Sequence, residues 1–202
     1  KNGYFYGFPH WVNQEYFINS LPVFNGNLRK VRVPINYQGT DFGFSGFNYP
    51  DNIDLTGELA SWKYFEHCEN LIKYYFTLKK QCEPYRDCIL MHYRDYKIPA
   101  WEVLDETYYR AALKKLPKKK IIVVTDNIDV AFKNIRINCE YTSNSPIEDF
   151  YLLANADYMV MSNSTFSAWA SWLSGAKTVA PGPALWFKYV KDAPKQDFYY
   201  IN

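Results

Sequence analysis

The hydrophobic pattern changes character near residue 86. Beyond that point, short apolar runs alternate with segments whose apolar residues recur every three to four positions. Such runs are typical of buried strands, and such segments are typical of amphipathic helices. The expected strands are 88–92, 121–124, 158–161 and 178–180, and the expected helices are 105–116, 145–153 and 164–174. Strands separated by helices predict an α/β fold with a Rossmann-type parallel sheet flanked by helices.

Residue types at the helix ends support these boundaries. Ser145, Pro146 and Glu148 form a capping box with proline in the first turn, so a helix should begin there. Gly175 follows the last expected helix, at the place where glycine commonly ends one. Acidic residues open the helix at 105–116 and lysines close it, which suits the helix dipole.

The first part of the chain differs in amino-acid composition and hydrophobic pattern. Residues 1–55 are rich in glycine, proline, asparagine and aromatic residues, and only 29–34 alternate as a short strand would. Apolar residues at steps of three and four predict one long helix, Leu59–Lys80. Aromatic residues form 19% of the chain, and they can supply either a core or a surface that stacks on sugar rings. We expect a smaller N-terminal lobe, residues 1–85, and a larger α/β domain, residues 86–202.

Composition narrows the class of protein. A chain of 202 residues, 48% of them hydrophobic, is long enough for one ordinary domain or two small lobes. Its net charge of +2 excludes a strongly basic nucleic-acid binder, and its apolar content excludes disorder. The apolar runs are far shorter than the about 20 residues that cross a bilayer, so we expect no membrane span in this fragment.

Polar residues follow three of the expected strands, at the sheet edge where parallel α/β folds bind ligands. His92, Arg94 and Asp95 lie at the end of the first of these strands. A guanidinium can clamp a phosphate with two hydrogen bonds, and His92 and Asp95 can orient it or carry a proton. An ordinary surface Arg–Asp pair is the alternative interpretation.

The other two strand ends carry Asp126 and the segment 162–167. Asp126 can accept hydrogen bonds from a nucleobase or ribose, or it can cap the helix that follows. Ser164 opens a helix whose backbone N–H groups and dipole suit a phosphate, or it acts only as a cap. Considering the three strand ends together, we predict that Arg94 and the helix start at Ser164 bind the same pyrophosphate group.

Four stretches of the chain also share the order and spacing of a known family. They read LTGELASWKYF at 55–65, HYR at 92–94, VVTDN at 123–127, and DFYLLA at 149–154 followed by MSNSTFSAWASWL at 161–173. The last stretch is the most specific. Through these stretches the chain resembles the α-1,2-fucosyltransferase family, part of the α-1,2/α-1,6/protein O-fucosyltransferase superfamily.

The resemblance implies an inverting, metal-independent, GT-B-type glycosyltransferase that moves L-fucose from GDP-fucose to a glycan hydroxyl. GDP-fucose would be a substrate, and no cofactor is implied. Residues 1–85 would then be an acceptor-side lobe, truncated or reduced, and residues 86–202 the nucleotide-sugar-binding domain. The 202 residues contain no D-x-D triplet, which agrees with metal independence.

Roles for single residues follow from the same resemblance. Arg94 would bind the donor diphosphate and act in catalysis, His92 would support it, and Asp126 would contact the nucleoside. For the mechanism, Asp95 is the candidate base, and Glu58 or a residue outside this fragment is the alternative. The remaining donor-binding residues would hold phosphate and base: Asn163, Ser164, Thr165 and Phe166.

Two departures from the family pattern leave alternatives open. Asp95 follows Arg94 directly, whereas the family has a second arginine and a glycine between them, so a rhamnosyl- or other deoxyhexosyltransferase with another nucleotide is possible. The family's G-x-G-N-Q-x-F segment is missing, which allows a non-catalytic carbohydrate-binding domain.

The compartment is predicted from the cysteines and the N-terminus. Four cysteines without a C-x-x-C pair or metal spacing are expected to be free thiols. Lys1 is not an initiator methionine, so we expect a fragment boundary there. No anchor or disulfide framework is visible, which favours the cytoplasm. The Golgi lumen is the alternative if an anchor preceded Lys1.

Overall fold

A computed structural model describes most of the second part of the chain and several segments of the first. The described residues are 13–21, 29–32, 53–56, 63, 66–80, 85–96, 103–182 and 199–201. Their centre is a six-stranded parallel sheet with the order β5-β4-β3-β6-β7-β8. The strands are β3 (Cys88–Tyr93), β4 (Lys120–Thr125), β5 (Glu140–Thr142), β6 (Tyr158–Val160), β7 (Lys177–Pro181) and β8 (Tyr199–Ile201).

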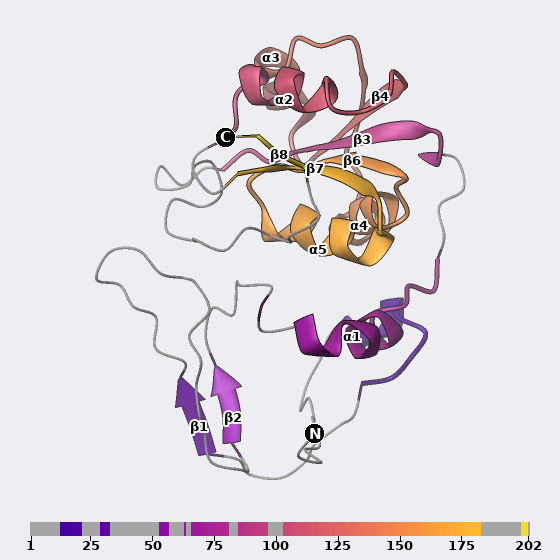
Figure 1. Ribbon diagram of the computed structural model, residues 1–202, viewed down its shortest axis with the longest axis vertical. Helices are drawn as coiled ribbons and strands as arrows, with labels where there is room; N and C mark the ends of the chain where they lie inside the picture. Colours follow the sequence, from indigo (N-terminus) through magenta and orange to yellow (C-terminus); the bar gives the residue numbers. More distant parts are fainter. Residues whose placement is uncertain are drawn as a thin grey trace.

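Helices cover both faces of this sheet (Figure 1). They are α2 (Glu106–Leu113), α3 (Ile128–Asn134), α4 (Pro146–Ala154) and α5 (Thr165–Ser174). Helices α2 and α3 lie on one face and α4 and α5 on the other (Figure 1). The predicted Rossmann-type α/β class is therefore confirmed, and it is consistent with one half of a GT-B-like fold.

Two hydrophobic clusters fill the spaces between sheet and helices. Successive residues of a strand point to opposite faces, so Leu90 of β3 belongs to the cluster under α4 and α5, and Met91 to the cluster under α2 and α3. All six residues of β3 are buried. Burial on both faces explains why the central strands read as continuous apolar runs instead of alternating ones.

The strand order reverses between β3 and β6. From β3 the chain moves outward through β4 to β5, and from β6 it moves outward the other way through β7 to β8. Met91 of β3 pairs with Val160 of β6, so the residues that follow these two strands leave the sheet side by side. Ligands of doubly wound folds bind at this kind of switch point, outside the carboxyl ends of the strands.

The helix caps agree with the sequence prediction. Ser145 and Glu148 form the capping box of α4, with proline in its first turn. The Ser164 hydroxyl accepts a hydrogen bond from the backbone N–H of Phe166 and so caps α5. Gly175 ends α5 with φ at +67°, a left-handed conformation that favours glycine.

Other boundaries were predicted wrongly. The helix expected over 105–116 ends at Leu113, because the amides of Lys115 and Leu116 bond three residues back, to Ala112 and Leu113, and tighten the chain into a turn. The edge strands β5 and β8 were not predicted, and no bounds were predicted for α3, which entered only as the helix that Asp126 could cap. Each edge strand has only three residues, all exposed or half-buried, so an apolar run does not mark it.

The first part of the chain contributes short elements. These are η1 (Gln14–Tyr16), β1 (Arg29–Arg32), β2 (Ile53–Thr56), η3 (Glu66–Cys68) and α1 (Glu69–Tyr75). Strand β1 confirms the short strand predicted within 29–34, and it pairs in parallel with β2. The division into two lobes at residue 85 stays a prediction.

The long helix predicted over 59–80 is only partly present. Most of 59–65 lies outside the described residues, and α1 ends at Tyr75. Beyond it, the Thr77 hydroxyl donates to the carbonyl of Lys73 at 2.8 Å, and the Thr77 carbonyl accepts from the Ile18 amide, also at 2.8 Å. This pairing with the segment around Phe17 replaces the helical hydrogen bonds that the sequence pattern predicted.

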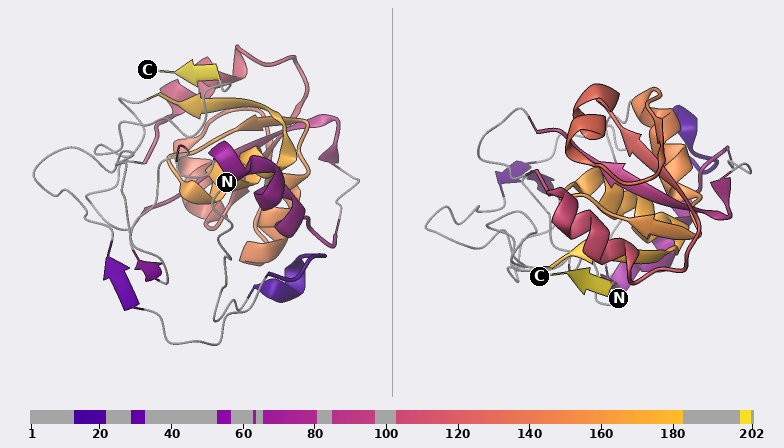
Figure 2. Two further views of the ribbon diagram at one scale, coloured as in Figure 1. Left: turned by 60° about the horizontal axis from the view of Figure 1, so that its bottom comes forward. Right: turned by 90° about the horizontal axis from the view of Figure 1, so that it is seen from above.

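Aromatic side chains join α1 and the segment 13–21 to the helices under the sheet. The rings of Phe76 and Trp169 stack with centroids 6.3 Å apart, and Tyr16 meets Tyr151 edge to face at 6.4 Å. The Tyr151 hydroxyl also donates to the Tyr16 carbonyl at 3.0 Å. Figures 1 and 2 accordingly show α1 next to α4 and α5. Aromatic residues thus supply packing here, the first of their two predicted uses.

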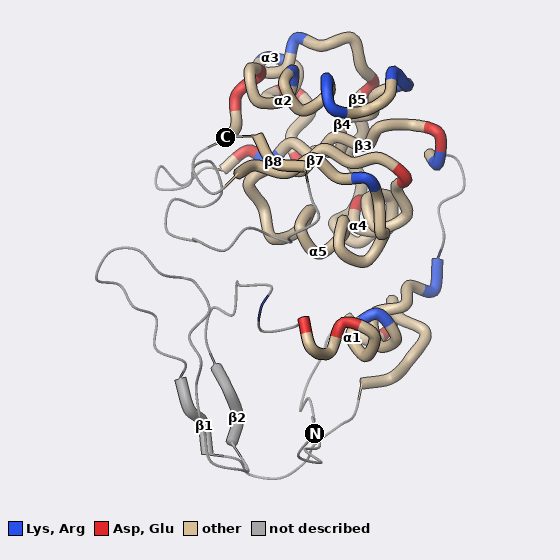
Figure 3. The backbone as a smooth tube through the Cα atoms, viewed as in Figure 1, with Lys and Arg blue, Asp and Glu red and all other residues tan. Residues whose placement is uncertain are grey.

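Charged residues lie at the carboxyl ends of the strands, where Arg94 pairs with Asp126, and also at the other edge of the sheet (Figure 3). Lys119 pairs with Asp87, and Lys120 pairs with Glu140 at 2.8 Å, at the opposite, amino end of β4. Cys68, Cys88 and Cys139 are free thiols. Among the described residues, no helix is long and apolar enough to cross a membrane.

Candidate active site

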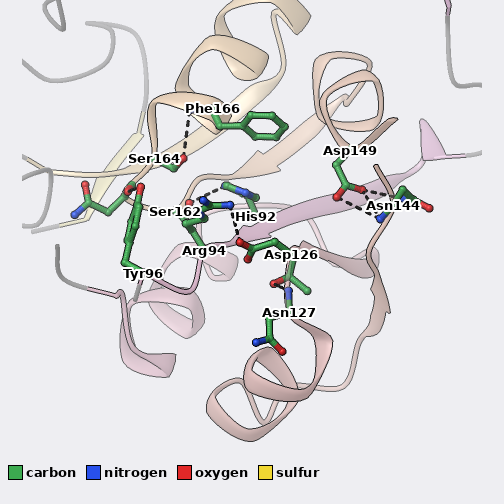
Figure 4. A network of polar contacts seen from close by, with 12 residues as sticks. His92, Arg94, Tyr96, Asp126, Asn127, Asn144, Asp149, Ser162, Ser164 and Phe166 are labelled. Carbon is green, nitrogen blue, oxygen red and sulfur yellow. Dashed lines mark hydrogen bonds and ion pairs between the residues drawn. The ribbon is translucent and has the colours of Figure 1, made fainter. Parts of the chain in front are cut away.

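The three polar strand ends predicted from the sequence meet at one edge of the sheet (Figure 4). Arg94, after β3, donates from Nη1 to Oδ2 of Asp126, after β4, at 2.6 Å. Tyr96 donates from its hydroxyl to the carbonyl of Asn163, after β6, at 2.7 Å. One short chain of contacts therefore joins β4, β3 and the start of α5.

The ion pair between Arg94 and Asp126 is open to solvent, since both side chains are 43% exposed. Exposed pairs contribute less than about 1 kcal/mol, so an anionic ligand can compete for the guanidinium. Asp126 does not cap α3, because Asn127 does so by accepting from the Val130 amide at 3.2 Å. The Asp126 carboxylate is therefore not used as a helix cap and lies at the site, paired with Arg94.

His92 is the buried member of the site, with 5% of its surface exposed. Its Nδ1 lies 2.7 Å from the Ser162 hydroxyl, and its ring centroid lies 5.5 Å from that of Phe166. Burial, together with the nearby charge of Arg94, lowers the pKa of His92 to about 3. His92 is therefore neutral near pH 7, and it can offer hydrogen bonds but no positive charge.

The start of α5 presents small polar groups. Ser162, Asn163 and Ser164 are 2%, 3% and 4% exposed, whereas Thr165 at the first helical position is exposed. The first backbone N–H groups of a helix have no partner within the helix, and the helix dipole favours an anion beside them. The Ser164 hydroxyl is occupied as a cap, so the backbone of the first turn is what α5 offers to a phosphate.

Phe166 lies between the site and the core. It is half-buried, and its ring meets Phe150 edge to face at 5.3 Å on the side of α4. With His92 beside it, Phe166 forms an apolar wall at the strand ends (Figure 4). A wall of this kind suits the flat face of a nucleobase.

Of the two candidate bases, the structure describes Asp95 but not Glu58. Asp95 is half-buried after β3, and within the described part of the chain its carboxylate makes no hydrogen bond or ion pair. Glu58 lies outside the described residues. Among the described residues, no group of three or more His, Cys, Asp or Glu side chains is arranged to hold a metal ion.

One acidic residue near the site was not assigned a role from the sequence. Asp149 on α4 is only 6% exposed, and it accepts hydrogen bonds from the backbone and the side chain of Asn144, the latter at 2.8 Å (Figure 4). Burial raises the pKa of its carboxyl group. Asp149 opens the stretch DFYLLA, which is one of the stretches that carry the family resemblance, but no role was predicted for it. In this structure Asp149 fastens the loop before α4.

The fold and this strand-end site define a Rossmann-type α/β domain with polar side chains at its switch point, and comparison with known proteins identifies the family. Residues 94–202 match the model of Glycosyl transferase family 11, which covers more than half of the chain. The chain belongs to this family, and the resemblance to α-1,2-fucosyltransferases is confirmed.

Several curated relatives are similar to the chain. Galactoside alpha-(1,2)-fucosyltransferase 2 of Hylobates lar is 26% identical, over 79% of this chain and 57% of the relative. The protein of the same name from Oryctolagus cuniculus is 28% identical, over 79% and 55%. Galactoside alpha-(1,2)-fucosyltransferase 1 of Saimiri sciureus is 26% identical, over 63% and 44%. The chain thus spans about half the length of these relatives. No solved structure matches it significantly.

Proposed function

We propose that this chain carries the nucleotide-sugar-binding half of an inverting, metal-independent glycosyltransferase that moves L-fucose from GDP-fucose to a glycan hydroxyl. The observation that supports the proposal is that Arg94 and the start of α5 both lie at the switch point of the sheet and are linked through Tyr96, in a member of Glycosyl transferase family 11. The acceptor glycan and the cytoplasmic location remain predictions.

The reaction requires stabilisation of the leaving group. As the bond between the anomeric carbon and the phosphate oxygen breaks, negative charge grows on the β-phosphate of the donor. Arg94 supplies a guanidinium and the first turn of α5 supplies N–H groups, each worth about 2–4 kcal/mol by analogy with oxyanion-hole donors. A multiply charged diphosphate can displace Asp126 from the exposed ion pair, because that pair is weak.

The acceptor hydroxyl attacks from the opposite face of the sugar and inverts the anomeric configuration. Its proton passes to a base, for which Asp95 and Glu58 are the candidates. The nucleoside lies against Phe166 and neutral His92, and Asp126 accepts hydrogen bonds from it. Arg94 and the helix N-terminus supply the countercharge in place of a metal ion, in agreement with the missing D-x-D triplet.

Replacing Arg94 by alanine tests this mechanism. Arg94→Ala should lower kcat/KM for fucosyl transfer by at least about 100-fold, the scale of one lost transition-state donor. The melting temperature should stay within a few degrees, since the ion pair is exposed. Arg136→Ala is the matched control, because Arg136 is exposed and lies beyond the far end of α3. Near-normal transfer by Arg94→Ala would remove this residue from the mechanism.

The directly adjacent Arg94 and Asp95 favour a second candidate, a deoxyhexosyltransferase that uses another nucleotide. Thermal unfolding with GDP, UDP or dTDP separates the two, because a ligand at 100 times its Kd stabilises the folded state by about 2.7 kcal/mol. A larger shift with UDP or dTDP than with GDP would contradict the GDP-fucose proposal. Hydrolysis of GDP-fucose without acceptor would argue against a non-catalytic binding domain.

A further inference from the structure

Tyr96 contacts both parts of the site that are proposed to hold the diphosphate. It lies two residues after Arg94, and the centre of the Arg94 guanidinium is 5.7 Å from the centroid of its ring. Its hydroxyl donates to the Asn163 carbonyl at 2.7 Å and also hydrogen-bonds with the Ser164 side chain. Figure 4 shows Tyr96 reaching from the Arg94 side of the site toward Ser164.

Each contact of Tyr96 restrains one group of the proposed diphosphate site: the Arg94 guanidinium or the backbone before α5. A cation over an aromatic ring is attracted to the face of that ring, so Tyr96 restrains a long side chain that is otherwise exposed. Asn163 immediately precedes the cap of α5, so a hydrogen bond to its carbonyl restrains the backbone that leads into the first turn. Asn163 and Ser164 are 3% and 4% exposed, and water competes little for hydrogen bonds at such buried groups.

We infer that Tyr96 is a positioning residue that sets the spacing between the Arg94 guanidinium and the start of α5 for one diphosphate. This inference rests on the proposed function. It differs from direct binding, since Tyr96 acts through its two neighbours. A tyrosine phenol is protonated at neutral pH, and burial raises the pKa of the Tyr96 phenol further, so Tyr96 keeps donating to the Asn163 carbonyl.

Two substitutions separate the contacts of Tyr96. Tyr96→Phe removes the hydroxyl and keeps the ring under Arg94, and the Kd for GDP should rise about five- to tenfold. Tyr96→Leu removes both contacts, and the Kd should rise about 10- to 50-fold. Tyr141→Phe is the matched control, because it also removes a hydrogen bond from a phenol to a backbone carbonyl, that of Ile135. It should leave the Kd for GDP unchanged.

Guanosine distinguishes positioning from a general loss of structure. Guanosine lacks the diphosphate, so both Tyr96 variants should bind it as tightly as the original protein does, as measured by titration. In Arg94→Ala, the further change Tyr96→Leu should raise the Kd for GDP by clearly less than it does alone, since residues acting as one unit are not additive.

The outcomes separate this inference from the proposed function. If Arg94→Ala leaves GDP binding unchanged, the proposed function fails and this inference fails with it. If Arg94→Ala weakens GDP binding but both Tyr96 variants bind GDP normally, only the role of Tyr96 is overturned. Equal weakening of GDP and guanosine binding in the Tyr96 variants would also overturn it, because the residue would then be merely structural.

Discussion

The ends of β3 and β6 lie side by side but are built in opposite ways. After β3 come a charged side chain and its partner from β4, Arg94 and Asp126, both 43% exposed. After β6 come Ser162, Asn163 and Ser164, which are neutral and at most 4% exposed. The chain turns at once from β6 into α5, whereas a longer segment separates β3 from α2.

This difference suggests that the two strand ends would contribute to anion binding in different ways. The β6 end presents backbone N–H groups whose direction is set by a helix, and such donors need no rearrangement when a ligand binds. The β3 end presents a charge that can exchange one anion for another. One side of the site is thus preorganised and the other can adapt, and Tyr96 contacts both.

The largest expected effect on stability tests whether the buried surroundings of His92 disfavour a positive charge. His92 has a pKa of about 3 in the folded protein, against about 6.5 in the unfolded chain. Between these values only the unfolded state binds the proton, so stability falls as the pH drops below 6.5. At 1.36 kcal/mol per pH unit, the free energy of unfolding should be lower by about 2 kcal/mol at pH 5 than at pH 7.

Urea unfolding of the original protein and of His92→Gln measures this effect. The variant should lose the part of the pH dependence that His92 causes. The raised pKa of Asp149 acts in the opposite direction but is present in both proteins, so the difference between them isolates His92. Parallel pH curves for the two proteins would show that the buried surroundings of His92 on β3, which include Ser162 after β6, tolerate a charged histidine.

A smaller effect tests the preorganised helix start. Ser164→Ala removes the cap of α5 and should cost about 1 kcal/mol of stability, as should Ser145→Ala, which removes the cap of α4. Only Ser164→Ala should also weaken GDP binding, because only α5 begins at the proposed phosphate site. Chemical unfolding and titration with GDP provide both measurements. Equal GDP affinities in the two variants would separate the cap of α5 from the site.

The smallest expected effect tests the adaptable side. Asp126→Asn should change the free energy of unfolding by less than about 1 kcal/mol, because the ion pair with Arg94 is exposed. It should weaken GDP binding, since the proposed contact to the nucleoside is impaired. Inorganic pyrophosphate should bind at least as tightly, since Arg94 loses a competing anion. Weaker pyrophosphate binding would mean that Asp126 serves mainly to orient Arg94.

Most elements of the α/β domain could be predicted because their signals are local or repeat along the chain. The apolar run of β3, the capping box at Ser145 and the glycine after α5 each appear within a few residues. The edge strand β5 could not be found in this way, since its three residues depend on pairing with β4. The end of α1 was missed because the segment around Phe17 competes for its backbone.

The sequence by itself determined the alternation of strands and helices, the capped helix starts and the polar residues at three strand ends. These depend on periodicity and on contacts between residues close in the chain. Only the tertiary structure decided that Arg94 faces Asp126, that His92 is buried and neutral, and that Tyr96 bridges to Asn163. Those features join residues 32 to 67 positions apart or depend on burial, and local sequence carries no signal for either.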